Sequence, residues 1–251
     1  MHLSSYLKCK FFIEHYFSGK SGLKILEVGS KSYEGQRSNR DLIPSSWEYV
    51  GLDIEAGQNV DLVPTNPFSW EEIPDNSYDI VISSQTFEHN PFFWVTMADI
   101  ARVLKEGGYV FIVAPGAGVV HRYPIDCWRF YPDAWSVLCA YSGLELMESY
   151  DETARPGKYV EGSEWKDSAM IARKPNFSTE AQRSVNSSRL QGILRSQPKS
   201  SMSTSPDRHL KLQAFQKYEN SLDGKSFKNV LGKIWRAIHP GIIYRRTFID
   251  S

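Results

Sequence analysis

The chain has 251 residues, of which 41% are hydrophobic and 23% are charged, a composition typical of a soluble globular protein with a substantial core. No apolar run reaches about 18 residues, which disfavours a membrane-spanning helix. The net charge is zero, but the charges are distributed unevenly along the chain. Residues 1–175 carry 16 basic and 24 acidic side chains, whereas residues 208–251 carry nine basic and three acidic side chains. An acidic body of this kind disfavours nucleic acid as a partner.

The cysteines and the amino terminus bear on the cellular compartment. Cys9, Cys127 and Cys139 are odd in number and lack the spacing of metal ligands, which favours a reducing compartment over a disulfide framework. Charged residues interrupt the apolar positions of 3–17, so this segment does not resemble a signal peptide. We therefore expect a cytoplasmic protein.

Hydrophobic periodicity predicts helices and strands in alternation. Helices are expected over 3–17, 92–104 and 133–142, with Gly107 and Gly108 as a helix stop after the second. Strands are expected over 24–28, 49–52, 59–63, 78–82, 109–113, 144–150 and 168–173. The alternation indicates an α/β fold with a doubly wound, Rossmann-like, mostly parallel sheet.

The domain organisation follows from shifts in composition. Residues 1–175 are the predicted globular domain, and 176–207, rich in Ser, Gln, Arg and Pro, form a predicted linker or loosely ordered arm. Over 208–251 the sequence predicts a basic amphipathic helix, with apolar residues at helical spacing from Phe227 to Ile238. This tail could pack on the acidic body, lie on an anionic membrane at the inner face near a lipid-linked substrate, or mediate oligomerisation.

Acidic residues at the ends of the first two strands predict a nucleoside site. Glu27 and Gly29 end the first strand, and Asp53 ends the second. In open α/β sheets ligands bind at the carboxyl ends of the strands, and an acidic residue one strand later binds the ribose hydroxyls. Because no Gly-x-Gly-x-x-Gly is present, a dinucleotide and a nicotinamide dehydrogenase are disfavoured.

Four motifs in this order resemble class I S-adenosylmethionine-dependent methyltransferases, in particular the methyltransferase domains often encoded near glycan and lipopolysaccharide synthesis functions. They are Ile25-Leu26-Glu27-Val28-Gly29, Gly51-Leu52-Asp53, Tyr78-Asp79-Ile80-Val81 with Phe87-Glu88-His89, and Arg102-Val103-Leu104-Lys105-Glu106-Gly107-Gly108. The resemblance covers residues 22–175.

The resemblance implies a seven-stranded sheet whose last strand is antiparallel, with S-adenosylmethionine as the cofactor and S-adenosylhomocysteine as the product. It implies that Glu27 and Gly29 line the methionine end of the cofactor and that Asp53 holds its ribose. The residues expected at the cofactor are Glu27, Gly29, Ser30, Asp53, Ile54, Ser83, Ser84 and Gln85. One departure is that Lys31 and Tyr33 stand where the family has two further glycines, with a glycine only later, at Gly35.

The loop after the fifth expected strand is the candidate acceptor site. Residues 118–130 combine a His, an Asp, two Arg and several aromatic residues, as a sugar site requires, and similar His-Arg-x-Pro-x-Asp-x-Trp-Arg-Phe runs occur in the resembling group. The candidate catalytic residues are His121 as general base, Asp126, and His89 as a rival base. The candidate substrate-binding residues are Arg122, Tyr123, Trp128 and Arg129.

These residues also have structural interpretations. Trp128 could belong to the core, and Asp126 with Arg129 could be an ion pair that fixes the loop. The spacing of Glu88, His89, His121 and Asp126 matches no metal-ligand pattern, so the sequence predicts no metal.

The sequence therefore predicts an O-methyltransferase acting on a sugar or glycan, which could be lipid-linked. The alternatives are a methyltransferase of a small metabolite or quinone-like ring, and a nucleoside-fold binding module without turnover, which the altered glycine loop motivates.

Overall fold

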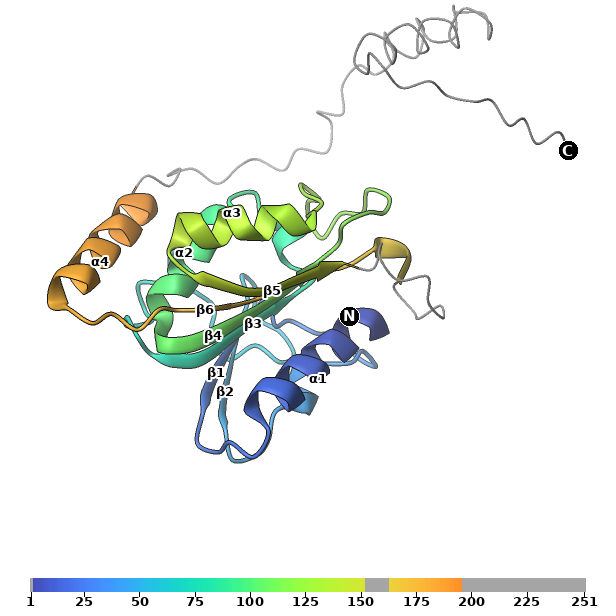
Figure 1. Cartoon of the computed structure of the whole chain (residues 1–251). Helices are drawn as coiled ribbons and strands as arrows, with labels where there is room; N and C mark the ends of the chain where they lie inside the picture. Colours follow the sequence, from blue (N-terminus) through green and yellow to red (C-terminus); the bar gives the residue numbers. More distant parts are fainter. Residues whose placement is uncertain (1, 152–162, 196–251) are drawn as a thin grey trace, which may run out of the picture. The chain divides into compact units, whose positions relative to one another are not determined.

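Strands and helices alternate in the computed structural model, which describes residues 2–151 and 163–195 (Figure 1). In chain order the elements are α1 (Leu3–Phe17), β1 (Lys24–Val28), η1 (Asn39–Leu42), β2 (Glu48–Leu52), β3 (Tyr78–Ser84), η2 (Phe87–His89), α2 (Phe93–Val103), β4 (Leu104–Ala114), α3 (Pro132–Ser142), β5 (Glu145–Asp151), η3 (Ser163–Trp165), β6 (Ser168–Arg173) and α4 (Glu180–Arg195). The alternation predicted from hydrophobic periodicity is confirmed.

The strands form one sheet in the order β2-β1-β3-β4-β6-β5. The pairings β1–β2, β1–β3 and β3–β4 are parallel, whereas β6 is antiparallel to both of its neighbours. The fold is thus a Rossmann-like α/β sheet, mostly parallel, with an antiparallel last strand in the chain. Within the described residues the sheet has six strands, so the expectation of seven was wrong.

The missing strand is the one expected over 59–63. This segment contributes only an isolated bridge between Leu52 and Leu62. Asn59 has φ of 72°, and the amides of Asp61 and Leu62 both donate to the same carbonyl, that of Gly51, at 2.8 and 2.9 Å. Two successive amides on one acceptor break the alternation that a ladder requires, and Pro64 has no amide to extend it.

Side chains alternate between the two faces of the sheet and form two cores. On one face Ile25, Ile80 and Phe111 pack with Phe12 of α1, and on the other Leu26, Val81 and Val110 pack with α2, α3 and α4. Figure 1 shows the same layers, with α1 on one side of the sheet and α2 and α3 on the other. Both faces are therefore covered, as parallel strands require.

The junction between α2 and β4 differs from the expectation. The helix ends at Val103, and Leu104 already has extended backbone and begins β4. Gly107 and Gly108 therefore lie within the strand instead of stopping the helix. Leu104 takes the extended conformation while its amide still donates to Ile100 O, so the turn needs no glycine.

The predicted arm over 176–207 is corrected in part, because residues 180–195 of it form α4. Leu190 and Leu194 are buried in the same core as α2 and α3, and Arg183 of α4 forms an ion pair with Glu106 of β4 at 2.6 Å. Two buried leucines at i, i+4 are enough to dock this otherwise polar helix. The amphipathic helix predicted in 208–251 lies outside the described residues.

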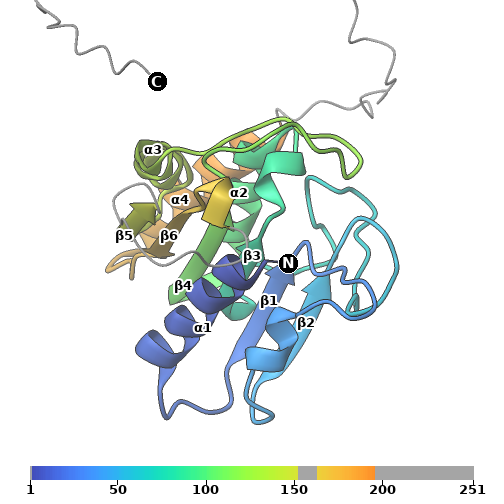
Figure 2. The same ribbon diagram turned by 90° about the vertical axis from the view of Figure 1, so that its right-hand side faces the viewer.

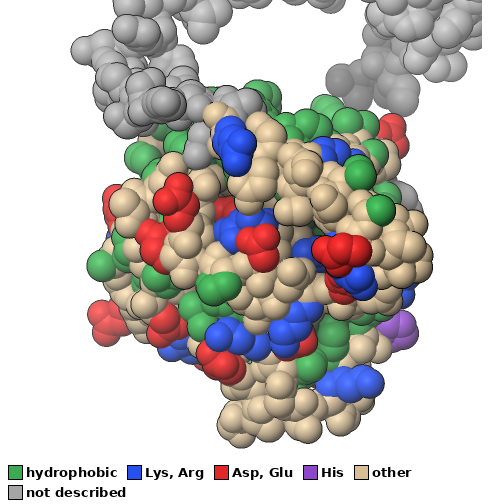
Figure 3. Space-filling view, turned by 90° about the vertical axis from the view of Figure 1, so that its left-hand side faces the viewer, with side chains coloured by type: hydrophobic (Ala, Val, Ile, Leu, Met, Phe, Trp, Pro, Cys, Tyr) green, Lys and Arg blue, Asp and Glu red, His purple; other side chains and the backbone are tan. Residues whose placement is uncertain are grey.

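Surface charge is mixed on the face seen in Figure 3, where acidic and basic side chains are interspersed without a large area of one sign. Among the helices that the structure describes, none has the length and apolar character needed to cross a membrane.

Candidate active site

A cavity lies at the carboxyl ends of β1 and β3 and is lined from three segments, which are the turn after β1, residues 36–39 and the end of β3. Its lining residues are Glu27, Gly29, Ser30, Lys31, Ser32, Gln36, Arg37, Ser38, Asn39, Ser84 and Gln85. Five of the eight residues expected at the cofactor belong to this lining, whereas Asp53, Ile54 and Ser83 do not.

Glu27 is a buried carboxylate in this lining and is only 4% exposed. Asn39 Nδ2 donates to its Oε1 at 2.8 Å, and the hydroxyl of Tyr49 donates to its Oε2. Burial raises the pKa of Glu27 to about 7, and the two hydrogen bonds limit the rise. Asn39 also donates to Ser84 Oγ at 3.1 Å, so it ties the segment before β2 to both β1 and β3. Sequence reasoning missed Asn39, because nothing distinguishes it within the polar stretch 30–40.

Gly29 has φ of +78°, and a Cβ built on it would lie 2.0 Å from Thr86 Oγ1. The turn that follows is held by Asp53, whose Oδ2 accepts the amide of Lys31 at 2.9 Å and whose Oδ1 accepts that of Glu55 at 3.3 Å. Lys31 Nζ in turn lies 2.8 Å from Glu55. The chain therefore fixes this turn with a carboxylate and a lysine at a place where the resemblance leads us to expect glycine.

The residues after β3 divide into two groups. The hydroxyl of Ser83 is fully buried and donates to Val28 O at 2.9 Å, so it joins two strands and does not line the cavity. Ser84 and Gln85 do line it. Ile54 is 55% exposed beside Asp53.

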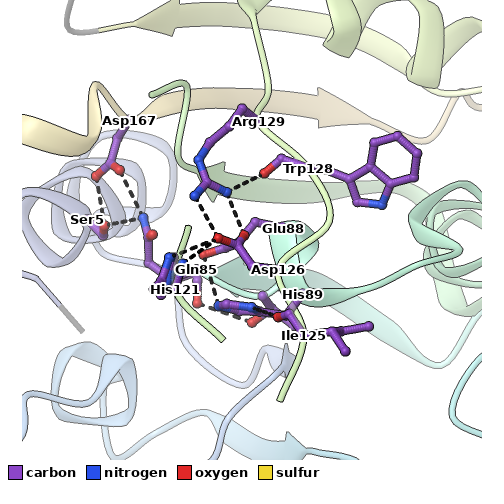
Figure 4. Close-up of polar contacts among 12 residues, drawn as sticks. Ser5, Gln85, Glu88, His89, His121, Ile125, Asp126, Trp128, Arg129 and Asp167 are labelled. Carbon is purple, nitrogen blue, oxygen red and sulfur yellow. Dashed lines mark hydrogen bonds and ion pairs between the residues drawn. The ribbon is translucent and has the colours of Figure 1, made fainter. Parts of the chain in front are cut away.

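Gln85 connects the cavity to the amino end of α1. Its Nε2 donates to Ser5 Oγ at 2.8 Å and to Asp167 Oδ1 at 3.0 Å (Figure 4), and Ser4 and Ser5 both donate to Asp167 Oδ2. Figure 2 shows that the amino end of α1 lies at the same end of the sheet as the arrowheads of β1 and β2. Sequence reasoning missed these partners, because the expected direction of β6 does not give the register that places Ser168 opposite Ala114, at the carboxyl end of β4.

Asp126 and Arg129 form an ion pair that fixes the loop after β4. Arg129 donates to both oxygens of Asp126, at 2.6 and 2.8 Å, and to Val119 O at 2.8 Å. The amide of His121 donates to Asp126 Oδ2 at 2.8 Å. Burial alone would raise the pKa of Asp126, but the hydrogen bonds from Arg129 and His121 lower it to about 2. Such a carboxylate is a weak base, so its contacts favour the positioning role over the catalytic one.

His89 and His121, the two candidate bases, lie together with ring centroids 4.9 Å apart. His89 comes from η2 after β3, and its Nδ1 lies 2.5 Å from Ile125 O. Its Nε2 lies 3.6 Å from Oε1 of Glu88, whose side chain is fully buried. Burial raises the pKa of Glu88 to about 8 and lowers the pKa of His89.

Aromatic rings surround the two histidines. Trp165 lies 4.6 Å from His121 between ring centroids, and Tyr123 lies 6.4 Å from His89. Tyr123 is 68% exposed. Trp128 instead donates to Asn90 O at 3.0 Å and packs edge-on against Phe93. Arg122 is exposed. Trp165 was missed for the same reason as Asp167, since it precedes β6.

The raised pKa of Glu27 gives a first prediction. A carboxyl whose pKa is about 7 in the folded state and about 4.5 in the unfolded state binds more protons when folded, so stability falls as pH rises from about 5 to 8. We expect this contribution to be on the order of 3 kcal/mol and Glu27→Gln to remove it. Urea unfolding of both proteins at several pH values measures the difference, and parallel pH profiles would contradict the prediction.

Comparison with known proteins agrees with this geometry. A family model described as "Methyltransferase domain" matches residues 35–112. A search of curated proteins finds no match. Similar solved structures include the 1,6-didemethyltoxoflavin-N1-methyltransferase of Burkholderia thailandensis, solved with S-adenosylhomocysteine (14% identity, 69% of this chain and 79% of that chain, TM-score 0.51). A second is a Haloferax volcanii protein solved with the Trm112 methyltransferase activator (17% identity, 70% of this chain and 91% of that chain, TM-score 0.50). A third is the YcgJ protein of Bacillus subtilis (13% identity, 68% of this chain and 100% of that chain, TM-score 0.50).

The likeness to these structures shows the class I methyltransferase fold. The family match over residues 35–112 and this fold together support methyl transfer from S-adenosylmethionine.

Proposed function

We propose that the protein methylates a hydroxyl of a sugar or glycan, with the cofactor in the cavity at β1 and the acceptor beside His121. The observation that carries this proposal is the position of two histidines and two aromatic rings next to the strand end that supplies Ser84 and Gln85. Flat apolar faces together with directional polar groups suit a sugar.

The residues of the cavity fit S-adenosylmethionine. Ser30 Oγ and Asn39 Oδ1 are buried without a hydrogen-bond partner, so each keeps unused hydrogen-bonding capacity beside the cavity. Asp53 lies outside the lining but holds the turn next to it, and it accepts one amide on each oxygen, which leaves acceptor capacity for ribose hydroxyls. We assign Glu27, Gly29 and Ser30 to the methionine end and Asp53 to the ribose. The cofactor supplies a methyl group already activated by the adjacent sulfonium.

The protein's own contribution is to orient the acceptor and to take up a proton. Holding the hydroxyl oxygen in line with the methyl carbon can lower the barrier by about 7–11 kcal/mol. As the new O–C bond forms, the hydroxyl proton passes to His121, and the electron pair of the broken C–S bond stays on sulfur. Asp126 holds the amide of His121 at 2.8 Å and so positions its ring.

Two substitutions separate cofactor binding from turnover. Asp53→Ala should weaken binding of S-adenosylmethionine at least about tenfold, because it removes a charged hydrogen-bond acceptor. His121→Ala should keep that affinity within about twofold and lower kcat by a factor of about 10²–10⁴. Calorimetry with the cofactor and its demethylated product, and methylation of a panel of sugars and oligosaccharides, measure both effects, with His15→Ala as the control.

Other outcomes select the alternatives. Transfer to a small aromatic ring but to no sugar would favour a small-metabolite methyltransferase, the class of the Burkholderia thailandensis neighbour. A folded protein that binds no S-adenosylmethionine would point to the non-catalytic binding module. The basic tail is tested separately by deleting 208–251 and measuring sedimentation onto anionic vesicles, since a lipid-linked acceptor would require contact with a membrane.

A further inference from the structure

Three side chains that can bind a metal meet between η2 and the loop after β4. Glu88, His89 and His121 each offer one ligand atom, and these atoms lie within 4.8 Å of one another. Figure 4 shows the three side chains approaching one another from the two segments. Because His89 and His121 lie 32 positions apart in the chain, no motif spacing indicates the cluster.

The carboxylate of Glu88 is the strongest sign that something else belongs there. Its side chain is fully buried, and neither oxygen receives a hydrogen bond of normal geometry. Buried carboxylates in proteins are almost always hydrogen-bonded, paired or bound to a metal. His121 Nδ1 is also buried without a hydrogen bond. Within the described residues, two of the three groups therefore have ion-pair contacts but no hydrogen bond of normal geometry.

His89 is held in the orientation that a metal ligand needs. A backbone carbonyl only accepts hydrogen bonds, so the 2.5 Å contact between His89 Nδ1 and Ile125 O places the proton on Nδ1. The lone pair is then on Nε2, which lies 3.6 Å from Glu88 Oε1. A carbonyl behind a histidine fixes its tautomer in the same way in known metal sites.

Charges around the cluster favour a cation. Asp126 Oδ2 lies 3.3 Å from His121 Nδ1 and adds a second carboxylate beside Glu88. Arg129 acts electrostatically on Glu88 and His89, but its guanidinium already donates to Asp126 and to Val119 O.

We propose that Glu88, His89 and His121 bind a divalent first-row transition-metal ion of the Zn²⁺ type. Two imidazoles and one carboxylate suit such an ion better than Mg²⁺ or Ca²⁺, which prefer oxygen ligands. Ligand atoms about 2.1 Å from a tetrahedral ion lie about 3.4 Å apart, so the cluster needs to contract by about 1 Å. Three protein ligands leave one position open, as in catalytic zinc sites.

The open position assigns a role to the ion, and this part rests on the proposed function. An acceptor hydroxyl bound there loses its proton more readily. With the ion bound, His121 is a ligand, and the hydroxyl proton passes to water instead of to its ring. The oxygen then forms the O–C bond as described above.

The test measures metal binding without cofactor or acceptor. Tag-free full-length protein carrying Cys127→Ser, which removes an exposed thiol that could bind zinc itself, is freed of metal with a chelator and titrated with ZnCl₂. Co²⁺ serves as a spectroscopic probe of coordination geometry. We expect one equivalent to bind with micromolar affinity or better. Glu88→Gln and His89→Ala should each weaken binding at least about a hundredfold, and His15→Ala, at an exposed histidine of α1, should leave it unchanged.

Each outcome decides the proposal. Absence of stoichiometric binding to the folded protein overturns it, as does equal affinity in Glu88→Gln or His89→Ala. The isosteric Glu88→Gln variant guards against loss of fold, which circular dichroism checks. Zinc binding without methylation of any sugar would support the metal site and contradict a sugar as the acceptor. Sugar methylation that persists in the presence of a chelator, without zinc binding, would support the sugar acceptor and contradict the metal site.

Discussion

Gly29→Ala should abolish measurable binding of S-adenosylmethionine and lower the free energy of unfolding by about 3 kcal/mol. Gly29 has φ of +78°, where an L-residue costs about 1–2 kcal/mol. The new Cβ would also lie 2.0 Å from Thr86 Oγ1, so Thr86 must move, which adds about 1–3 kcal/mol as overpacking does elsewhere. The strained backbone at position 29 also shifts the next residue, Ser30, whose hydroxyl we assign to the cofactor.

Gly35→Ala is the matched control. Gly35 has nearly the same φ, +76°, but a Cβ there has no neighbour within 4 Å. It should show the conformational penalty alone, about 1 kcal/mol, and retain cofactor binding. Urea unfolding and calorimetry measure both variants. Equal losses in the two proteins would show that contact with Thr86 does not matter.

Asp126→Ala should lower the free energy of unfolding by about 3 kcal/mol and remove turnover. Its side chain is 2% exposed, and it accepts two hydrogen bonds from Arg129 and one from the amide of His121. Removing one partner of a largely buried ion pair typically costs about 3–5 kcal/mol. Without Asp126 the loop carrying His121 loses its attachment, so kcat should fall even though Asp126 itself takes up no proton.

Glu145→Ala controls for the loss of an ion pair as such. Glu145 pairs with Arg173 at 2.8 Å, but their side chains are 48% and 34% exposed, and such pairs contribute at most about 1 kcal/mol.

The stability of the wild-type protein should also fall as the pH drops from about 4 to 2, through the lowered pKa of Asp126. Asp126→Ala should lose that part of the acid dependence. Normal turnover in Asp126→Ala would contradict the role of Asp126 in positioning His121.

The sequence predicted the fold well because hydrophobic periodicity reports burial directly. The helix over 3–17 and the strand starting at Lys24 were placed at their observed bounds, and the antiparallel final strand followed from the resemblance. The prediction of a strand over 59–63 was wrong because the apolar pattern says nothing about the direction of the backbone amides. Two of these amides donate to the same carbonyl, that of Gly51.

Prediction of the site was less complete, because most of its contacts depend on topology. Glu27 and Gly29 could be found at the end of a strand. Asn39 could not, nor could Asp167, whose position depends on the register in which β6 pairs with β4. The approach of Glu88 and His89 to His121 arises between two loops, and no local pattern encodes it.

The hydrogen bond between Ser5 and Asp167 joins residues 162 positions apart and has a consequence for biogenesis. During synthesis the first helix leaves the ribosome long before Asp167 exists, so Ser4, Ser5 and Gln85 cannot complete their hydrogen bonds to Asp167 until nearly all of this domain has emerged. These contacts at the carboxyl ends of the strands can therefore form only once the start of β6 has emerged. The same ordering means that partial opening of the amino-terminal helix in the mature protein would expose Gln85 while the sheet stays intact.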